Sequence, residues 1–252
     1  MKIRTQIFEY YDTPISEGDR IEISESNIHH LRDVLRVKDD ELIKIIINKS
    51  QEALASIEVS KKQLFAKIVN IKEIVSHQNP VTSLCFAFCK SAQNEFVCEK
   101  ATELGVENLI FWKSEHTSIK IKELDDKLTR LNKIAEGAAR QSKQDFLPNI
   151  VLKESLPSAV DFLRCEFSDK KNLFLYTSLE DDVKLLSDIP EIFSKDDLAI
   201  HIFVGPEGGF SQNESKFMHE FAKSVTLGDS VLKAETAAVV AISQVQVLRR
   251  MV

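Results

Sequence analysis

Four of the seven glycines in this chain fall within twenty-four residues, and their positions constrain the fold more than any other feature. Three of them lie in the segment Gly205–Gly209 (GPEGG), which follows an apolar run, Leu198–Val204. The segment precedes Ser211-Gln-Asn-Glu214, the pattern of a capping box at the start of a helix. The fourth, Gly228, follows a short apolar segment and also precedes an apolar helix. Two glycine turns at strand ends predict a ligand site at the carboxyl edge of an α/β sheet.

The Gly205–Gly209 loop could instead be a plain tight turn, since glycine is common in turns. Its position between a strand and a helix, together with the second glycine turn, favours a ligand loop. The loop lacks the Gly-x-Gly-x-x-Gly spacing of dinucleotide folds, and no Gly-Lys-Ser/Thr sequence follows it, which excludes a Walker-type phosphate loop. Bare backbone amides without a lysine suit a ligand that is recognised by the edge of a base such as adenine.

The first seventy-five residues have the pattern of short strands separated by turns. The expected strands are Thr5–Glu9, Asp19–Ile23, Glu41–Ile47, Ala53–Val59 and Leu64–Ile71. One helix interrupts them near Ser26, with apolar residues Ile28, Leu31 and Leu35 on one face. Five strands and one helix in a segment of this length predict a small β-barrel domain over residues 1–75.

A polar stretch that ends at Pro80 is the expected linker, and a second domain is expected over residues 80–252. Beyond the linker, strands and helices alternate, which predicts a mostly parallel sheet with helices on both faces. The expected strands are 82–88, 108–112, 149–152, 173–177, 199–204 and 225–227. The expected helices are 94–104, 123–143, 155–163, 181–186, 211–223 and 234–250.

The last expected helix, Ala234–Arg250, is apolar nearly all the way round. A helix that is apolar on every side is expected to be buried on every side. At the end of a chain of this size, a second copy of the chain is the expected cover for its outer face. The sequence therefore predicts a homodimer formed through this helix.

Composition limits the class of protein. The formal net charge of −6 argues against a general nucleic-acid coat, although a specific RNA enzyme needs only a local basic patch. No apolar run approaches the roughly 20 residues of a membrane span. The four cysteines form no Cys-x-x-Cys pair, so no metal site is expected and a reducing cytoplasm fits best.

Few charged residues stand out as functional candidates on their own. Glu207 lies in the glycine loop, where its carboxylate could orient a substrate or hold the loop by accepting amide protons. Glu235 and Thr236 begin the last helix, and a cap with a favourable helix-dipole interaction is sufficient reason for both. Arg32, Arg36 and Lys38 could form a basic face for RNA phosphates, although neighbouring aspartates dilute it.

Gly205–Ser211 (GPEGGFS) and Leu227–Ala237 (LGDSVLKAETA) together resemble the paired signature of the SPOUT-class 16S ribosomal RNA uridine-N3 methyltransferases. His29-His30 with Val34–Arg36, then Lys100–Val106 and Ala138–Ser142, resemble further motifs of that family in the same order. The resemblance covers nearly the whole chain. It implies a PUA-like RNA-binding barrel, a trefoil-knotted methyltransferase domain and an active site at a dimer interface.

The resemblance also implies S-adenosylmethionine as the cofactor and, as the substrate, one uridine of 16S rRNA within the small ribosomal subunit. The implied cofactor-binding residues are Tyr176, Thr177, Val204, Gly205, Pro206, Glu207, Gly208, Gly209, Leu227, Gly228, Ser230, Val231, Leu232, Thr236 and Ala237. The implied RNA-binding residues are His30, Arg32, Arg36, Lys38, Gln141 and Lys143. Uracil N3–H is weakly acidic, and Glu207, Arg36 and Arg140 are the candidates for the base or the group that stabilises the anion.

The chain departs from the family pattern at several positions. Ser230 and Lys233 stand where arginine is frequent, and Lys143-Gln144 replaces a common Gly-Arg pair. Lysine does not reproduce the bidentate phosphate contacts of a guanidinium, so RNA contacts at these positions are less secure. Two alternatives stay open: a SPOUT methyltransferase that acts on another RNA such as tRNA, and a non-catalytic RNA-binding protein.

Overall fold

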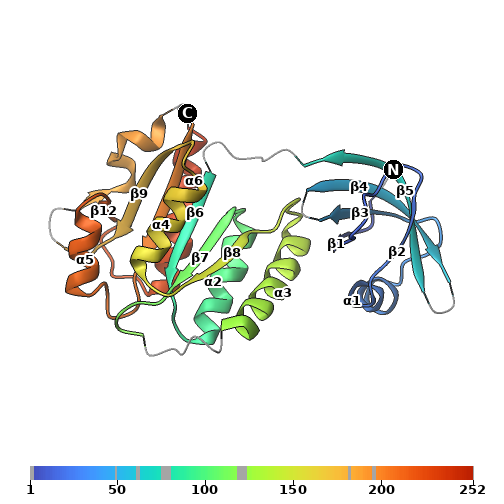
Figure 1. The fold of residues 1–252 in the computed structure, drawn as a ribbon, viewed down its shortest axis with the longest axis horizontal. Helices are drawn as coiled ribbons and strands as arrows, with labels where there is room; N and C mark the ends of the chain where they lie inside the picture. Colours follow the sequence, from blue (N-terminus) through green and yellow to red (C-terminus); the bar gives the residue numbers. More distant parts are fainter. Residues whose placement is uncertain are drawn as a thin grey trace. The chain divides into compact units, whose positions relative to one another are not determined.

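The computed structural model describes residues 3–48, 50–60, 63–74, 81–117, 124–180, 183–194 and 197–251. The chain forms two compact units, the first from Met1–His77 with Ala139–Leu147 and the second from Gln78–Ala138 with Pro148–Val252 (Figure 1). The expected linker before Pro80 lies outside the described residues.

A five-stranded sheet forms the first unit. Its strands are β1 (Gln6–Glu9), β2 (Arg20–Glu22), β3 (Leu42–Ile47), β4 (Gln51–Val59) and β5 (Leu64–Glu73), in the spatial order β1-β3-β4-β5-β2. β1 runs parallel to β3, and the other neighbours are antiparallel. Alternate residues of β4, at Ala53, Ala55 and Ile57, are fully buried, as expected for a sheet with one face on a core. All five strands were predicted from the sequence.

The predicted helix near Ser26 is present but changes its winding. It begins as α1 (Glu25–His29) and continues as a single π-helical turn over His30–Val34, where the Leu35 N–H donates to the carbonyl of His30. Leu31 is completely buried, whereas Val34 is 61% exposed. Arg36 follows in the left-handed region, with φ of 51°. Turns of this kind are frequent at functional sites.

A segment distant in sequence completes the first unit. Residues 139–147 include the C-terminal end of α3 (Leu124–Ser142), and Ala139 and Leu147 pack against Phe8 and Ile46. The ammonium group of Lys44 pairs with Asp145 at 2.8 Å and with Glu52 at 3.2 Å. The compact unit therefore extends beyond residues 1–75.

A seven-stranded sheet, parallel throughout the described pairings, forms the second unit. Its strands are β6 (Val81–Ala87), β7 (Asn108–Trp112), β8 (Asn149–Lys153), β9 (Lys171–Thr177), β10 (Lys184–Leu185), β11 (Leu198–Val204) and β12 (Lys223–Thr226). Their spatial order is β10-β12-β9-β11-β6-β7-β8. β6, β7 and β11 are buried at every residue, because helices cover both faces of the sheet.

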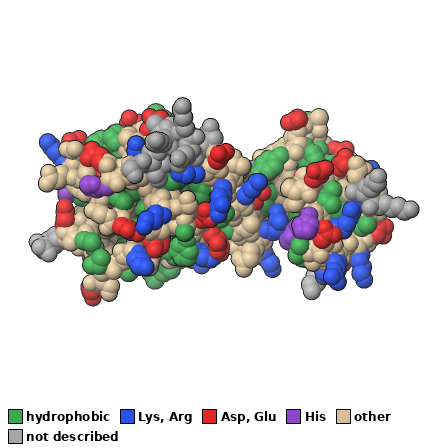
Figure 2. Space-filling view, turned by 90° about the horizontal axis from the view of Figure 1, so that it is seen from below, with side chains coloured by type: hydrophobic (Ala, Val, Ile, Leu, Met, Phe, Trp, Pro, Cys, Tyr) green, Lys and Arg blue, Asp and Glu red, His purple; other side chains and the backbone are tan. Residues whose placement is uncertain are grey.

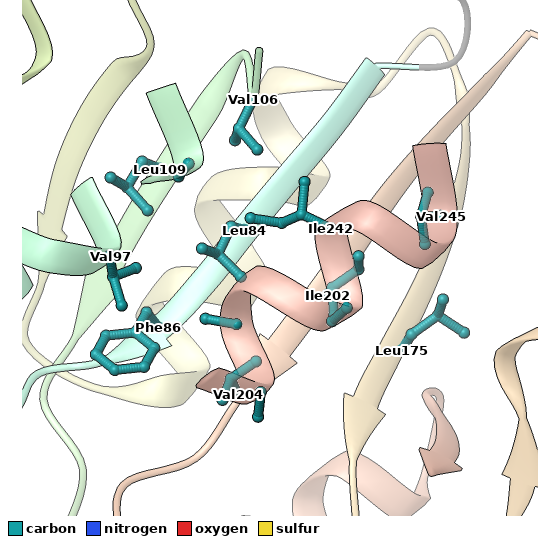
Figure 3. Close-up of a cluster of buried hydrophobic side chains, with 14 of the residues drawn as sticks. Leu84, Phe86, Val97, Val106, Leu109, Leu175, Ile202, Val204, Ile242 and Val245 are labelled. Atoms are coloured by element: carbon teal, nitrogen blue, oxygen red, sulfur yellow. The ribbon is translucent and has the colours of Figure 1, made fainter. Parts of the chain in front are cut away.

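Two hydrophobic layers hold the helices on this sheet. On one face lie α2 (Ser91–Glu103), α3 and α6 (Ala234–Arg249), and on the other lie α4 (Leu156–Glu166) and α5 (Gln212–His219). Figure 3 shows Ile242 and Val245 of α6 among Leu84, Ile202 and Leu175 of the sheet. The mostly parallel α/β architecture predicted from the alternation of elements is confirmed.

The sequence prediction is wrong for the helix expected at 181–186. Residues 181 and 182 lie outside the described part of the chain, but Lys184–Leu185 form strand β10, which pairs with β12, and Leu186–Asp188 form a 3₁₀ turn. α5 also ends at His219 rather than at Lys223, since Lys223 pairs with Leu175 as the first residue of β12. Sheet pairing here overrides the apolar pattern on which both predictions were based.

The last helix is buried on only one side within this chain. Its inner face, which includes Ala238, Ala241, Ile242 and Val245, is completely buried. On its outer face Thr236 and Val247 are exposed. The outer face is the side that the sequence assigns to a second copy of the chain, and that assignment stays a prediction.

Candidate functional site

A cavity of about 590 Å³ lies at the carboxyl ends of β9, β11 and β12. Most of its lining comes from residues within three segments, Tyr176–Glu180 at the end of β9, Val204–Phe210 at the end of β11 and Val225–Ala237 at the end of β12. Ser215 of α5 also lines it. The volume is in the range of pockets that hold a small molecule or a cofactor. The cavity therefore lies at the edge of the sheet where the glycine turns predict a ligand site.

Twelve of the fifteen residues expected to bind the cofactor line this cavity. They are Tyr176, Thr177, Val204, Gly205, Pro206, Glu207, Gly209, Leu227, Ser230, Val231, Leu232 and Ala237. Gly208, Gly228 and Thr236 are not among the lining residues, although each adjoins one. Gly209 and Gly228 have φ angles of 74° and 138°, so the backbone at both turns requires glycine.

Other lining residues were not predicted to bind the cofactor. They are Ser178, Leu179, Glu180, Phe210, Ser215, Val225, Thr226, Lys233 and Ala234. Most of them directly adjoin predicted residues along the chain. Among the described residues, Glu180 and Lys233 are the charged members of the cavity wall besides Glu207. The loop after β9 contains no glycine, so nothing in its composition indicated how far it follows the cavity.

The ring of Phe210, at the end of the loop, explains why residue 205 is glycine. A Cβ atom at Gly205 would lie 3.1 Å from the ring of Phe210. That ring is held in place, because it stacks on Trp112 with centroids 5.8 Å apart and meets Tyr176 edge to face at 5.7 Å. The close approach of backbone to ring therefore fixes one wall of the cavity.

We expect Gly205→Ala to distort this wall. Overpacking against a fixed ring costs about 1–3 kcal/mol. If the loop shifts to relieve this clash, restoring its binding conformation should make the affinity for the ligand about tenfold to a hundredfold weaker. Gly208→Ala is the matched control, because a Cβ there meets nothing within 4 Å. Calorimetric titration of both variants with S-adenosylhomocysteine measures the effect, and equal affinities would contradict this role of Gly205.

The carboxylate of Glu207 is joined to a second carboxylate through an amide. The side-chain nitrogen of Gln93, in α2, donates to Glu207 at 2.7 Å and to Glu235, in the first turn of α6, at 3.2 Å. Both carboxylates also lie close to the thiol of Cys89, whose pKa is raised to about 11 by burial, with smaller contributions from Glu207 and Glu235. Glu207 thus has a defined orientation at the rim of the cavity.

Arg36 and Arg140, the other two candidates for catalysis, belong to the first unit. The guanidinium of Arg140 donates to the side-chain oxygen of Asn27 at 3.1 Å. Asn27 in turn donates to the buried carboxylate of Glu9 at 2.9 Å and to the carbonyl of Phe8 at 2.7 Å. Arg140 is therefore held by a polar network, whereas Arg36 is exposed.

The residues expected to bind RNA differ in their exposure and in their contacts within the protein. Arg32 donates to the carbonyls of Ser60 and Gln63, at 3.1 Å each, and so has a structural role. The pKa of His30 is lowered by burial and, to a smaller extent, by Arg140 and His29, which favours the neutral imidazole. Arg36, Lys38, Gln141 and Lys143 are exposed. Figure 2 shows one face of the molecule, on which Lys and Arg side chains are interspersed with Asp and Glu.

Within the described ranges, no group of three or more His, Cys, Asp or Glu residues is arranged to hold a metal ion. None of the helices in the same ranges combines the length and the hydrophobicity that crossing a bilayer demands.

The parallel sheet and the cavity at its carboxyl edge define an α/β protein of a ligand-binding class. Residues 77–246 match the family described as RNA methyltransferase domain, and residues 23–69 match the RNA methyltransferase PUA domain. The chain belongs to this family of RNA methyltransferases. The resemblance noted in the sequence is thereby confirmed.

Individual relatives cover nearly the whole chain. A Ribosomal RNA small subunit methyltransferase E from Rickettsia conorii is 28% identical over 95% of this chain and 94% of its own. A methyltransferase from Legionella pneumophila, solved with bound S-adenosylmethionine, is 28% identical with a TM-score of 0.81 over 98% of each chain. A Ribosomal RNA small subunit methyltransferase E from Neisseria gonorrhoeae, also bound to S-adenosylmethionine, is 26% identical with a TM-score of 0.80 over 97% of each chain.

Proposed function

We propose that this protein transfers a methyl group from S-adenosylmethionine to N3 of one uridine in the 16S rRNA of the small ribosomal subunit. The observation that carries the proposal is the cavity built by the two glycine turns, on a fold shared with relatives that bind this cofactor. The relatives named for small-subunit ribosomal RNA support the substrate class. Such a substrate implies a cytoplasmic location.

The cavity fits the cofactor in size and chemistry. A volume of about 590 Å³ accommodates an adenosine with an amino-acid tail. Backbone groups of Gly205–Gly209 and Leu227–Leu232 offer donors and acceptors to a base edge. Glu180, Glu207 and Lys233 are the charged residues in the described part of the wall, and the rest of this lining is backbone, apolar or hydroxyl-bearing, which suits an adenosine.

When bound, the sulfonium of the cofactor supplies an activated methyl group. Protein residues must orient the uracil and remove the N3 proton. Glu207 is our candidate base, since its carboxylate lies at the cavity rim and is oriented by Gln93. Arg36 and Arg140 are the candidates that stabilise the resulting anion, and His30, Lys38, Gln141 and Lys143 the candidates that hold RNA together with them.

We further propose that the protein acts as a homodimer formed through α6. The outer face of this helix carries Val240 and Val247, and Val247 is 53% exposed in the single chain. An exposed apolar face of this kind suits contact with a second subunit. The same helix begins at the cavity. Thr236, on the same exposed side, lies one residue from the cavity wall.

Methylation assays with labelled S-adenosylmethionine test the proposed function. We expect incorporation into 30S subunits that lack the modification, with less into free 16S rRNA and none into bulk tRNA. Mass spectrometry of nuclease fragments should locate one 3-methyluridine. Label in tRNA would instead indicate another RNA substrate, and absence of both label and calorimetric heat with the cofactor would indicate a non-catalytic RNA-binding protein.

A further inference from the structure

The loop after β9 brings an additional carboxylate to the cavity. Glu180 lies three residues beyond the end of the strand and lines the cavity together with Thr177 and Ser178. Its backbone N–H donates to the hydroxyl of Ser178 at 3.2 Å, so the loop is folded on itself. The side chain of Glu180 is 56% exposed, which leaves its carboxylate open to a ligand.

A histidine from another element stands beside this carboxylate. His219, at the end of α5, has its Nε2 atom 3.7 Å from an oxygen of Glu180. Both ring nitrogens also lie near the hydroxyl of Tyr176, Nδ1 at 3.1 Å and Nε2 at 3.4 Å, and the two rings meet edge to face at 5.7 Å. Tyr176 is 2% exposed and forms part of the same cavity wall. The imidazole thus connects a buried cavity residue to the carboxylate.

The phenol of Tyr176 is the buried part of this connection. Burial, with a smaller contribution from Glu180, raises the pKa of the phenol, whereas a hydrogen bond with Ser224 lowers it. The phenol hydroxyl lies beside the imidazole of His219, which in turn lies beside the carboxylate of Glu180. The carboxylate oxygens of Glu180 can accept hydrogen bonds from neutral hydroxyl donors.

We propose that Glu180 is a binding residue that accepts hydrogen bonds from the ribose hydroxyls of the cofactor, and that His219 is its positioning residue. Carboxylates near the ends of parallel strands recognise ribose hydroxyls in other nucleotide-binding folds. Among the described charged residues of the wall, Glu207 accepts from Gln93 and Lys233 carries no acceptor, whereas the carboxylate of Glu180 is exposed to the cavity. The inference rests on the proposed function, because it assumes an adenosine-containing cofactor.

Calorimetry with two ligands tests the assignment. S-adenosylhomocysteine and 5′-methylthioadenosine share the ribose, but only the first has the amino-acid part. We expect Glu180→Gln to weaken both by about tenfold, as for loss of a hydrogen bond to a charged acceptor. Loss confined to S-adenosylhomocysteine would show that the carboxylate binds the ammonium group, and loss of neither would overturn the proposal.

The 2′-deoxy analogue of 5′-methylthioadenosine separates recognition from a structural effect. The unsubstituted protein should bind 5′-methylthioadenosine more tightly than its 2′-deoxy analogue. Glu180→Gln should remove most of this difference in affinity, whereas general damage to the cavity would weaken both ligands alike. His219→Asn should weaken the affinity for these ligands less than Glu180→Gln does. The double variant should bind them as weakly as Glu180→Gln alone. Glu220→Gln is the control, since this exposed carboxylate is the neighbour of His219 but lies outside the cavity.

Different results would contradict the proposed function and the proposed role of Glu180. If the unsubstituted protein binds neither S-adenosylmethionine nor S-adenosylhomocysteine, the proposed function itself is wrong. If it binds them and Glu180→Gln retains both the affinity and the preference for the ribose form, only the role of Glu180 is wrong. An unchanged thermal unfolding midpoint for each variant ensures that the comparison concerns binding.

Discussion

Glu207→Gln is expected to reduce the rate of methyl transfer by about a hundredfold to ten-thousandfold, the usual contribution of a general base. The substitution keeps the shape of the side chain and keeps an oxygen that can accept from Gln93, whose nitrogen lies 2.7 Å away. The loop should therefore hold its conformation while losing the ability to take a proton. Single-turnover methylation of 30S subunits measures the rate, and calorimetry should find unchanged affinity for S-adenosylhomocysteine.

Glu235→Gln provides a closely matched control for this experiment. Glu235 accepts from the same nitrogen of Gln93, at 3.2 Å, but is not among the residues that line the cavity. Its substitution should leave the rate within about a factor of two, the size of a typical surface effect. If Glu207→Gln also retains full turnover, Glu207 serves only to hold the loop, which is the other function that a carboxylate between Pro206 and Gly208 could have.

Local sequence patterns were sufficient to predict most of the fold. The buried run Leu198–Val204 and the capping box at Ser211 and Glu214 appear where the pattern places them, and both reciprocal bonds of the box are present. The glycine turns located the cavity because left-handed backbone at Gly209 and Gly228 needs glycine, whatever the surroundings. Such signals are carried within a few residues and need no knowledge of distant contacts.

Features that depend on contacts between residues far apart in sequence were not predicted. Strand β10 exists because Lys184 and Leu185 meet Val225 and Thr226, and the apolar pattern of its own segment favoured a helix. Glu180 was not predicted as a site residue; its loop lines the cavity and lies beside His219, thirty-nine residues later in the chain. Likewise, nothing near Arg140 in sequence indicated Asn27, which accepts from it. Pairings across such separations cannot be read from one sequence.

Val247→Asp is expected to convert the proposed dimer into a monomer and to reduce methylation by about a hundredfold or more. Val247 is 53% exposed on the outer side of α6, so an aspartate there should leave the isolated subunit folded. In a symmetric interface the substitution introduces two carboxylates, one from each subunit, into an apolar contact. Burial of unpaired charge costs several kcal/mol, which is enough to dissociate an interface of ordinary affinity.

Light scattering after size exclusion measures the mass of each variant, and methylation assays with 30S subunits measure its activity. Val69→Asp is the control, because Val69 is 45% exposed and lies on strand β5 of the first unit rather than on α6. It should remain a dimer with normal activity. A monomeric Val247→Asp that methylates at the normal rate would show that one subunit holds a complete active site. A dimeric Val247→Asp would show that the subunits meet elsewhere, because two unpaired carboxylates could not persist in an apolar contact.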